Sequence, residues 1–282
     1  MTRSRAPLPP LPTDPFECLC QGCERPWEVA TDPFEVARDT YYVGNNWVGA
    51  YLLASDDGLA LIDTTMQPQV YLVLENIRKL GFDPLDIRKI LISHMHYDHT
   101  GGVRALVEHT GAELLMSRED WDFMNRNPDQ IFTEGYPFGS FTPDGFFDDD
   151  RPVRLGRRSI RTVLSPGHTP GTTSFFFEAE GADGRPALCG MHGGVGLNTM
   201  TDEALAVSGQ PRSIRDDFMR SLLSLREIPV DITLGSHPKQ VGMMEKVGLI
   251  RPGHNPFQDP ALWHQLIDGR IAQVRALMED AA

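Results

Sequence analysis

Residues 94–99 read His-Met-His-Tyr-Asp-His and place four potential metal ligands within six positions. They follow an apolar, strand-like run, so a strand would fix the root of the loop that aims these side chains. In an extended loop alternating residues point to the same side, so His94 and His96 can share one ion. Asp98 and His99 can face a second ion. A single histidine is usually structural, but four ligands this close together predict a metal site.

Two more histidines stand downstream in similar positions. His168 occurs in LSPGHTPG and His237 in TLGSHP, and each follows a β-rich apolar run and is bracketed by turn residues. Because both would lie at strand ends, separate loops can bring them to the face of the His-rich loop. The sequence therefore offers six ligands for one metal centre.

The combination of H-x-H-x-D-H, a PGHTPG turn and a late strand ending in histidine resembles the metallo-β-lactamase superfamily. The resemblance extends from about Phe34 to the C-terminus. It is most similar to the subgroup of class B β-lactamases whose zinc sites use only His and Asp, because HNPFQDP near residue 254 also resembles that subgroup. The resemblance implies an α/β fold, the four-layer αβ/βα metallo-β-lactamase sandwich, with two Zn²⁺ ions per chain.

Carried onto matching positions, the resemblance also divides the ligands between the two ions. The first zinc would be held by His94, His96 and His168. The second zinc would be held by Asp98, His99 and His237.

The strand after PGHTPG departs from the pattern of many superfamily members, which place a bridging aspartate there. This chain has Leu-Cys-Gly-Met-His at residues 188–192, with no carboxylate. Cys189 is either a ligand, as cysteine is in other subgroups, or a thiol packed inside the strand, and the packed thiol is the favoured interpretation.

Zinc lowers the pKa of bound water from about 15.7 to about 7. The resemblance therefore implies a zinc-dependent hydrolase in which a zinc-bound hydroxide opens a β-lactam amide and Asp98 orients that hydroxide. The same site suits a lactone, a thioester or another small acyl substrate, because the metal chemistry is common to all. A related iron-dependent redox enzyme would need another carboxylate or a flavin domain, and a non-catalytic module would be expected to have lost ligands.

Residues outside the ligand set are further candidates. Asp63, at the end of the strand LALID, matches a position where superfamily members often place an aspartate that supports the histidine loop, with turn capping as the alternative. His192 opens the Gly-rich loop HGGVGLNT and is a candidate catalytic and substrate-binding donor, unless it is merely solvated. Asn198 in the same loop is another substrate-binding candidate.

Residues 119–150 are aromatic and punctuated by Pro and Gly, which predicts a long irregular loop or lid over the site. Trp47 and, within this segment, Trp121, Phe132, Tyr136 and Phe141 are candidates for an apolar substrate pocket above the metals. Packing in the core is the alternative for each aromatic ring.

We divide the chain into an N-terminal arm, residues 1–33, and a hydrolase domain, residues 34–282. The arm is rich in Pro and Cys and has no sustained hydrophobic period. Short strand-like runs open the domain, and helical spacing predicts helices over residues 67–81 and 259–278. Two strand-rich halves, each accompanied by helices, agree with the sandwich.

Composition limits the partners. The formal net charge of −13 would repel a phosphate backbone, which excludes nucleic acid and anionic membranes as expected partners and leaves a small-molecule carbonyl substrate. No signal peptide or membrane span is visible, so we expect a cytoplasmic protein. Cys18, Cys20 and Cys23 are expected to be free thiols or to form one local disulfide, and a structural zinc there is the less favoured alternative. The sequence leaves the oligomeric state open.

Overall fold

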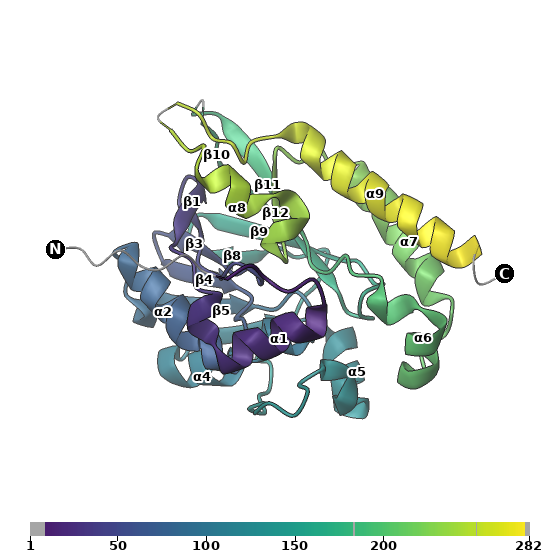
Figure 1. The fold of residues 1–282 in the computed structure, drawn as a ribbon. Coiled ribbons are helices and arrows are strands. Elements are labelled where there is room, and N and C mark those ends of the chain that lie inside the picture. The colour runs from purple at the N-terminus through teal and green to yellow at the C-terminus, as the bar shows by residue number, and fades with distance from the viewer. Residues whose placement is uncertain (1–8, 183, 252, 280–282) are drawn as a thin grey trace.

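The computed structural model describes residues 9–182, 184–251 and 253–279. It contains two β-sheets flanked by helices (Figure 1). The first sheet has seven strands in sequence order; its first four pair as an antiparallel meander, and β4 to β7 run parallel. These strands are β1 (Phe34–Ala37), β2 (Thr40–Tyr42), β3 (Tyr51–Ser55), β4 (Gly58–Ile62), β5 (Ile87–Leu91), β6 (Glu113–Met116) and β7 (Gly145–Phe146).

The second sheet has five strands in the order β12-β11-β10-β9-β8. Neighbours from β8 to β11 are antiparallel, whereas β12 runs parallel to β11 after a helical crossover. These strands are β8 (Val153–Leu155), β9 (Arg158–Leu164), β10 (Thr173–Glu180), β11 (Pro186–His192) and β12 (Ile232–Gly235).

Three apolar clusters fill the spaces between the layers. One lies between the sheets and includes Tyr51 of the first sheet and Phe175 of the second. Their neighbours Leu52 and Phe176 point the opposite way, because side chains alternate across a strand. Leu52 joins a cluster with α2 (Val70–Lys79) and α4 (Val103–Thr110). Phe176 joins a cluster with α7 (Ile214–Arg226) and α9 (Pro260–Glu279). The order helix, sheet, sheet, helix confirms the predicted four-layer sandwich.

The helices form where the sequence has helical spacing. The helix predicted over residues 67–81 is confirmed as η2 (Gln67–Gln69) and α2 (Val70–Lys79). The predicted C-terminal helix is α9 (Pro260–Glu279), which packs along α7 (Figure 1). The remaining α-helices after α2 are α3 (Tyr97–Thr100), α4 (Val103–Thr110), α5 (Arg118–Arg126), α6 (Asp202–Ser208), α7 (Ile214–Arg226) and α8 (Met243–Val247). The remaining 3₁₀ helices are η1 (Pro26–Glu28), η3 (Pro84–Asp86), η4 (Pro128–Ile131), η5 (Asn198–Met200) and η6 (Pro238–Val241).

The segment before β1 contains a helix that the sequence analysis did not predict, α1 (Pro15–Glu24). Asp14 caps it by accepting a hydrogen bond from the Glu17 backbone N–H, and a proline at the first helical position has a φ that suits the helix. Helix α1 packs against η2. The cysteines at positions 18, 20 and 23 are free thiols on this helix.

The prediction of an irregular segment over residues 119–150 is wrong in its first part. Helix α5 and η4 occupy residues 118–131, and β7 pairs with β6. Helix α5 forms because Ser117 caps its N-terminus and acidic residues stand in its first turn, where they favour the helix dipole. Trp121 is therefore a helical residue, and the irregular stretch is confined to the residues between η4 and β7.

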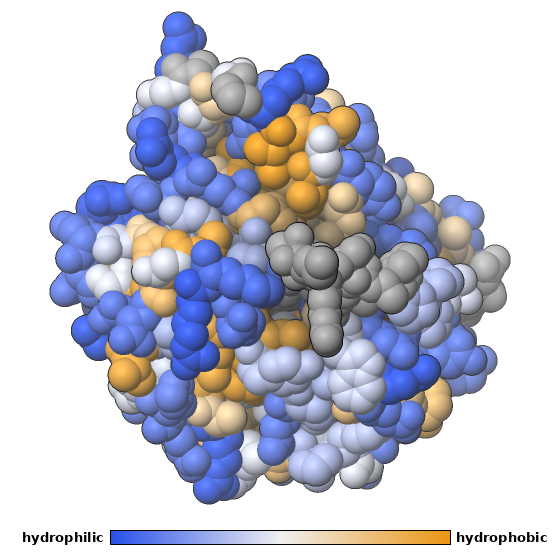
Figure 2. All heavy atoms as spheres, turned by 60° about the vertical axis from the view of Figure 1, so that its left-hand side comes forward, coloured by the Kyte–Doolittle hydropathy of each residue, from blue (hydrophilic) through white to orange (hydrophobic). Residues whose placement is uncertain are grey.

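Of the helices in the described residues, none has both the length and the apolar character needed to span a membrane. On the face shown in Figure 2, hydrophilic residues cover most of the surface and apolar residues form separate patches.

Candidate metal centre

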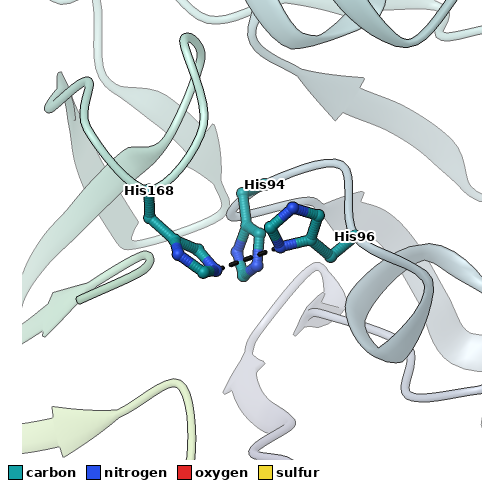
Figure 3. A group of neighbouring side chains, drawn as sticks. All are labelled: His94, His96 and His168. Carbon is teal, nitrogen blue, oxygen red and sulfur yellow. Dashed lines mark hydrogen bonds between the residues drawn. The ribbon is translucent and has the colours of Figure 1, made fainter. Parts of the chain in front are cut away.

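The first ligand group consists of His94, His96 and His168, whose rings converge from two loops (Figure 3). The first two follow β5, and His168 lies in the turn between β9 and β10. His96 Nδ1 and His168 Nε2 are 3.0 Å apart, and one ligand atom from each of the three residues lies within 4.8 Å of the others. Because all three side chains are buried, their nitrogens face one another rather than solvent.

The second ligand group is centred on Asp98. Its Oδ2 atom lies 3.3 Å from His99 Nε2 and 3.3 Å from His237 Nε2. His237 follows β12 of the second sheet, so this group joins loops from both sheets. His94, Asp98 and His99 also offer one ligand atom each within 4.8 Å of one another, so the two groups adjoin at His94.

Hydrogen bonds from the Nδ1 atoms orient two of the rings. His168 Nδ1 lies 3.0 Å from the Gly196 carbonyl oxygen, and His237 Nδ1 lies 2.7 Å from that of Trp47. A carbonyl oxygen only accepts, so Nδ1 donates in each case and Nε2 keeps its lone pair for a metal. The Nε2 atoms of His94 and His99 are buried and have no hydrogen-bond partner. Buried nitrogens of this kind with imidazole and carboxylate neighbours fit a divalent metal such as zinc.

The electrostatics of the two groups differ. Burial, with the neighbouring histidines, holds the pKa values of His94 and His96 well below the usual range and lowers the pKa of His168 to about 4. Burial also opposes the charge on His99, but Asp98 and Asp63 outweigh it and raise the pKa of His99 to about 10. The first group therefore offers neutral imidazoles, whereas metal binding to the second must displace a proton from His99.

Asp63 lies directly behind the His-rich loop. It is fully buried, and its Oδ2 atom is 2.7 Å from His99 Nδ1. It also accepts hydrogen bonds from the backbone N–H and the hydroxyl of Ser93, at 2.8 and 2.7 Å. Its backbone has a φ of 61°, a conformation rare outside glycine that these hydrogen bonds hold in place. The residue thus orients His99, the geometry expected of a supporting aspartate.

Asp120 is a second buried aspartate behind the centre, and the sequence analysis did not single it out. Its carboxylate accepts hydrogen bonds from the Met95 N–H at 2.8 Å, the Gly171 N–H at 2.6 Å and the Thr169 hydroxyl at 2.8 Å. Burial raises its pKa to about 6 even though these donors favour the ionised form. Asp120 therefore ties the loop of His94 and His96 to the turn of His168.

Two glycines enclose the His168 ring. A Cβ atom on Gly194 would lie 2.7 Å from His168 Cδ2, and one on Gly196 would lie 2.8 Å from His168 Cε1. Both distances are shorter than a van der Waals contact. The Gly-rich loop after β11 thus positions a metal ligand through its lack of side chains.

The metal centre opens into a cavity of about 800 Å³. Metal ligands form one side, and the Gly-rich loop, including Asn198, contributes another part of the lining. Phe132 also lines the cavity; its ring centroid is 4.8 Å from that of His96. Residues 11–16 with Cys18 and Leu19 supply a further wall. The prediction that Trp47 and Phe132 line a pocket agrees with this cavity, whereas the sequence analysis did not identify the N-terminal wall.

Comparison with known proteins agrees with this geometry. The sequence model of the metallo-beta-lactamase superfamily matches residues 48–184. The native FEZ-1 metallo-beta-lactamase of Legionella gormanii has a similar structure, with a TM-score of 0.81 and 26% identity, over 89% of this chain and 97% of FEZ-1. The chain carries a metallo-beta-lactamase superfamily domain. BJP-1 of Bradyrhizobium japonicum, a subclass B3 metallo-beta-lactamase, is similar with a TM-score of 0.78 and 27% identity, over 90% of this chain and 98% of BJP-1. These neighbours fit the subgroup that the sequence resembles.

Curated sequence relatives of this metallo-beta-lactamase domain include a lactonase. The N-acyl homoserine lactonase AttM of Agrobacterium fabrum is 31% identical over 109 residues, which is 36% of this chain. The match spans 40% of the length of that lactonase.

His192 does not occupy the place predicted for a substrate or catalytic donor. It is buried, lies outside the cavity lining, and packs edge-on against Phe218 with ring centroids 5.8 Å apart. Its Nδ1 accepts a hydrogen bond from the Gly194 N–H at 3.2 Å. His192 thus supports the Gly-rich loop from behind this domain's metal centre.

Three of the predicted aromatic pocket residues lie away from the cavity lining. Trp121 and Phe141 pack together with ring centroids 6.0 Å apart, and both join the apolar cluster outside the first sheet. Tyr136 belongs to the same cluster and donates its hydroxyl to Glu24 at 3.0 Å. We therefore correct these three residues from substrate contacts to packing residues. Cys189 is a buried thiol in the cluster between the sheets, with a pKa raised to about 12 by burial.

Proposed function

We propose that this metallo-beta-lactamase superfamily hydrolase uses two zinc ions to open a β-lactam amide. The observation that carries the proposal is the convergence of six His and Asp side chains, five of which line one cavity, on a fold similar to that of FEZ-1 over most of both chains. The acidic net charge of −13 supports a small carbonyl compound rather than a nucleic acid as substrate.

The metal ligands and the buried aspartates would have different roles in such a reaction. Zinc, when bound, supplies a water that is ionised near neutral pH and polarises a carbonyl group. His94, His96 and His168 would hold the first ion, and Asp98, His99 and His237 the second. Asp63 and Asp120 keep the ligand loops in register through the hydrogen bonds described above. Asp98 faces two imidazoles through one oxygen, and its other oxygen would orient the attacking water.

A lactone, a thioester or another small acyl compound is the alternative substrate. The curated relatives favour a lactone, since AttM is named as an N-acyl homoserine lactonase. The match covers a part of that enzyme only, whereas the similarity to FEZ-1 extends over 97% of the FEZ-1 chain. This difference in coverage is why we place the β-lactam first.

The test is hydrolysis by zinc-loaded protein of a chromogenic cephalosporin, beside an acyl homoserine lactone and a thioester. We expect turnover of the cephalosporin that a chelator abolishes and zinc restores. His96→Ala and His237→Ala should each lower bound zinc and activity, whereas His109→Ala, an exposed histidine on α4, should change neither. Turnover of the lactone or thioester alone would overturn the β-lactam proposal. Full metal content in both ligand variants would overturn the metal assignment.

A further inference from the structure

A single arginine from the C-terminal helix reaches the cavity of the metal centre. Arg270 of α9 lines the same cavity as the metal ligands and the Gly-rich loop. Helix α9 buries Trp263, Ile267 and Val274 against the second sheet and α7. Arg270 comes three residues after Ile267 and four before Val274, so it lies on the same helical face. A charged residue thus occupies a position on the apolar stripe of α9.

Arg270 is half-buried and differs in its partners from two fully buried arginines. Arg215 is 3% exposed and donates to Asp202, and Arg158 is 6% exposed and donates to four backbone carbonyl groups. Within the described part of the chain, no carboxylate lies within ion-pair distance of Arg270, whose hydrogen bond goes to Gln273 Oε1 at 2.6 Å. A guanidinium has five N–H groups, so further donors remain for a ligand in the cavity that Arg270 lines.

The charged groups that line the cavity have both signs. Besides Arg270 they include Lys239, Asp14, Asp98 and Glu134. Burial lowers the pKa of Arg270, and its charge contributes to the low pKa of His192, behind the Gly-rich loop. A half-buried guanidinium without a counter-ion is costly unless an anion joins it. Arg270 therefore gives its own part of the cavity a local preference for anions.

We propose that Arg270 is a specificity-determining residue that binds a carboxylate of the substrate while the scissile carbonyl group lies at the metal ligands. A planar guanidinium pairs with a carboxylate through two parallel hydrogen bonds. The amide of Asn198, which lines the same cavity, is a second hydrogen-bond donor available to the substrate. The inference rests on the proposed hydrolase function and narrows the substrate class to acyl compounds that carry a carboxylate.

The first experiment compares a cephalosporin with its methyl ester, which differ in the carboxylate alone. In zinc-loaded protein, Arg270→Gln should raise KM for the acid by about 10- to 100-fold, the loss expected for a charge-assisted pair. The KM for the ester should stay unchanged, and Arg270→Lys should lie between. The matched control is Arg275→Gln, an exposed arginine on the same helix, which should behave as the wild type. Equal effects of Arg270→Gln on acid and ester would overturn the proposal.

A second experiment separates this inference from the choice of scissile bond. The probe pair is 4-mercaptobutyrate and its methyl ester, whose thiol can ligate zinc while the other end enters the cavity. We expect wild-type protein to bind the acid at least about tenfold more tightly than the ester, and Arg270→Gln to lose this preference. With that result, failure to hydrolyse cephalosporins would refute the β-lactam proposal and leave the anion site standing. Equal affinity of wild-type protein for acid and ester would overturn the anion site.

Discussion

Replacing Gly196 by alanine tests whether the Gly-rich loop holds a metal ligand in place. The added Cβ would stand 2.8 Å from His168 Cε1 and 2.9 Å from His168 Nδ1. Two carbons pack at about 3.5 Å, so the imidazole must shift by roughly 0.7 Å. Zinc–nitrogen bonds tolerate only about 0.2 Å. Because a second added Cβ, on Gly194, would press on Cδ2 of the same ring, Gly194→Ala should have a similar effect.

We expect each variant to lower zinc affinity at the first site by about 10- to 100-fold, as loss of an orienting contact does in other metal sites. Neither glycine has a positive φ, so the backbone itself permits alanine. Zinc affinity is measured by competition with a chromogenic chelator, and thermal unfolding of the metal-free variants checks the fold. Gly248→Ala is the control, since φ there is −66° and its Cβ would meet nothing within 4 Å. Zinc affinities equal to that of this control would refute the reasoning.

Three further changes test other parts of the structure. Asp120→Asn leaves the N–H of Met95 or of Gly171 facing an amide NH₂ group, which cannot accept a hydrogen bond. We therefore expect zinc affinity to fall by about 10- to 100-fold. The exposed Asp122→Asn on the same helix should leave it unchanged. Arg158→Lys should lower the free energy of unfolding by about 2–4 kcal/mol in urea titrations while zinc content stays normal, because one ammonium cannot reach all the carbonyl groups that this guanidinium joins. Burial lowers the pKa of His192 to about 3, against about 6.5 when unfolded. Its contribution to stability is complete above pH 6.5 (about the unfolded pKa) and is lost as the pH falls towards 3, by about 2 kcal/mol between pH 7 and pH 5. His192→Asn should remove that part of the acid sensitivity, and an unchanged pH slope would contradict the assignment.

The ligands were predictable because their spacing is local or their flanking turns are distinctive. The stretch from His94 to His99 presents its donors within one loop, and PGHTPG marks His168. No local sequence motif distinguishes Asp120 from the other acidic residues, of which the chain has 39 in all. The residues that donate hydrogen bonds to its carboxylate lie 25 or more positions away in the sequence. Only the folded chain brings its carboxylate to the two ligand loops.

The prediction that His192 contacts substrate is wrong because side chains alternate between the two faces of strand β11. Met191 is in the cluster between the sheets, so the next side chain must point to the other face of β11, towards α7. The alternation of apolar residues along that strand would have placed His192 away from the metals.

Helix α1 could also have been predicted, because Asp14-Pro15 is an N-cap followed by a proline at the first helical position.

The N-terminal wall of the cavity comes from a different part of the chain than the metal ligands do. Residues 11–16 stand outside both sheets, whereas every metal ligand lies in a segment that directly follows a strand. Changes to residues 11–16 can therefore reshape the cavity while the metal ligands keep their geometry.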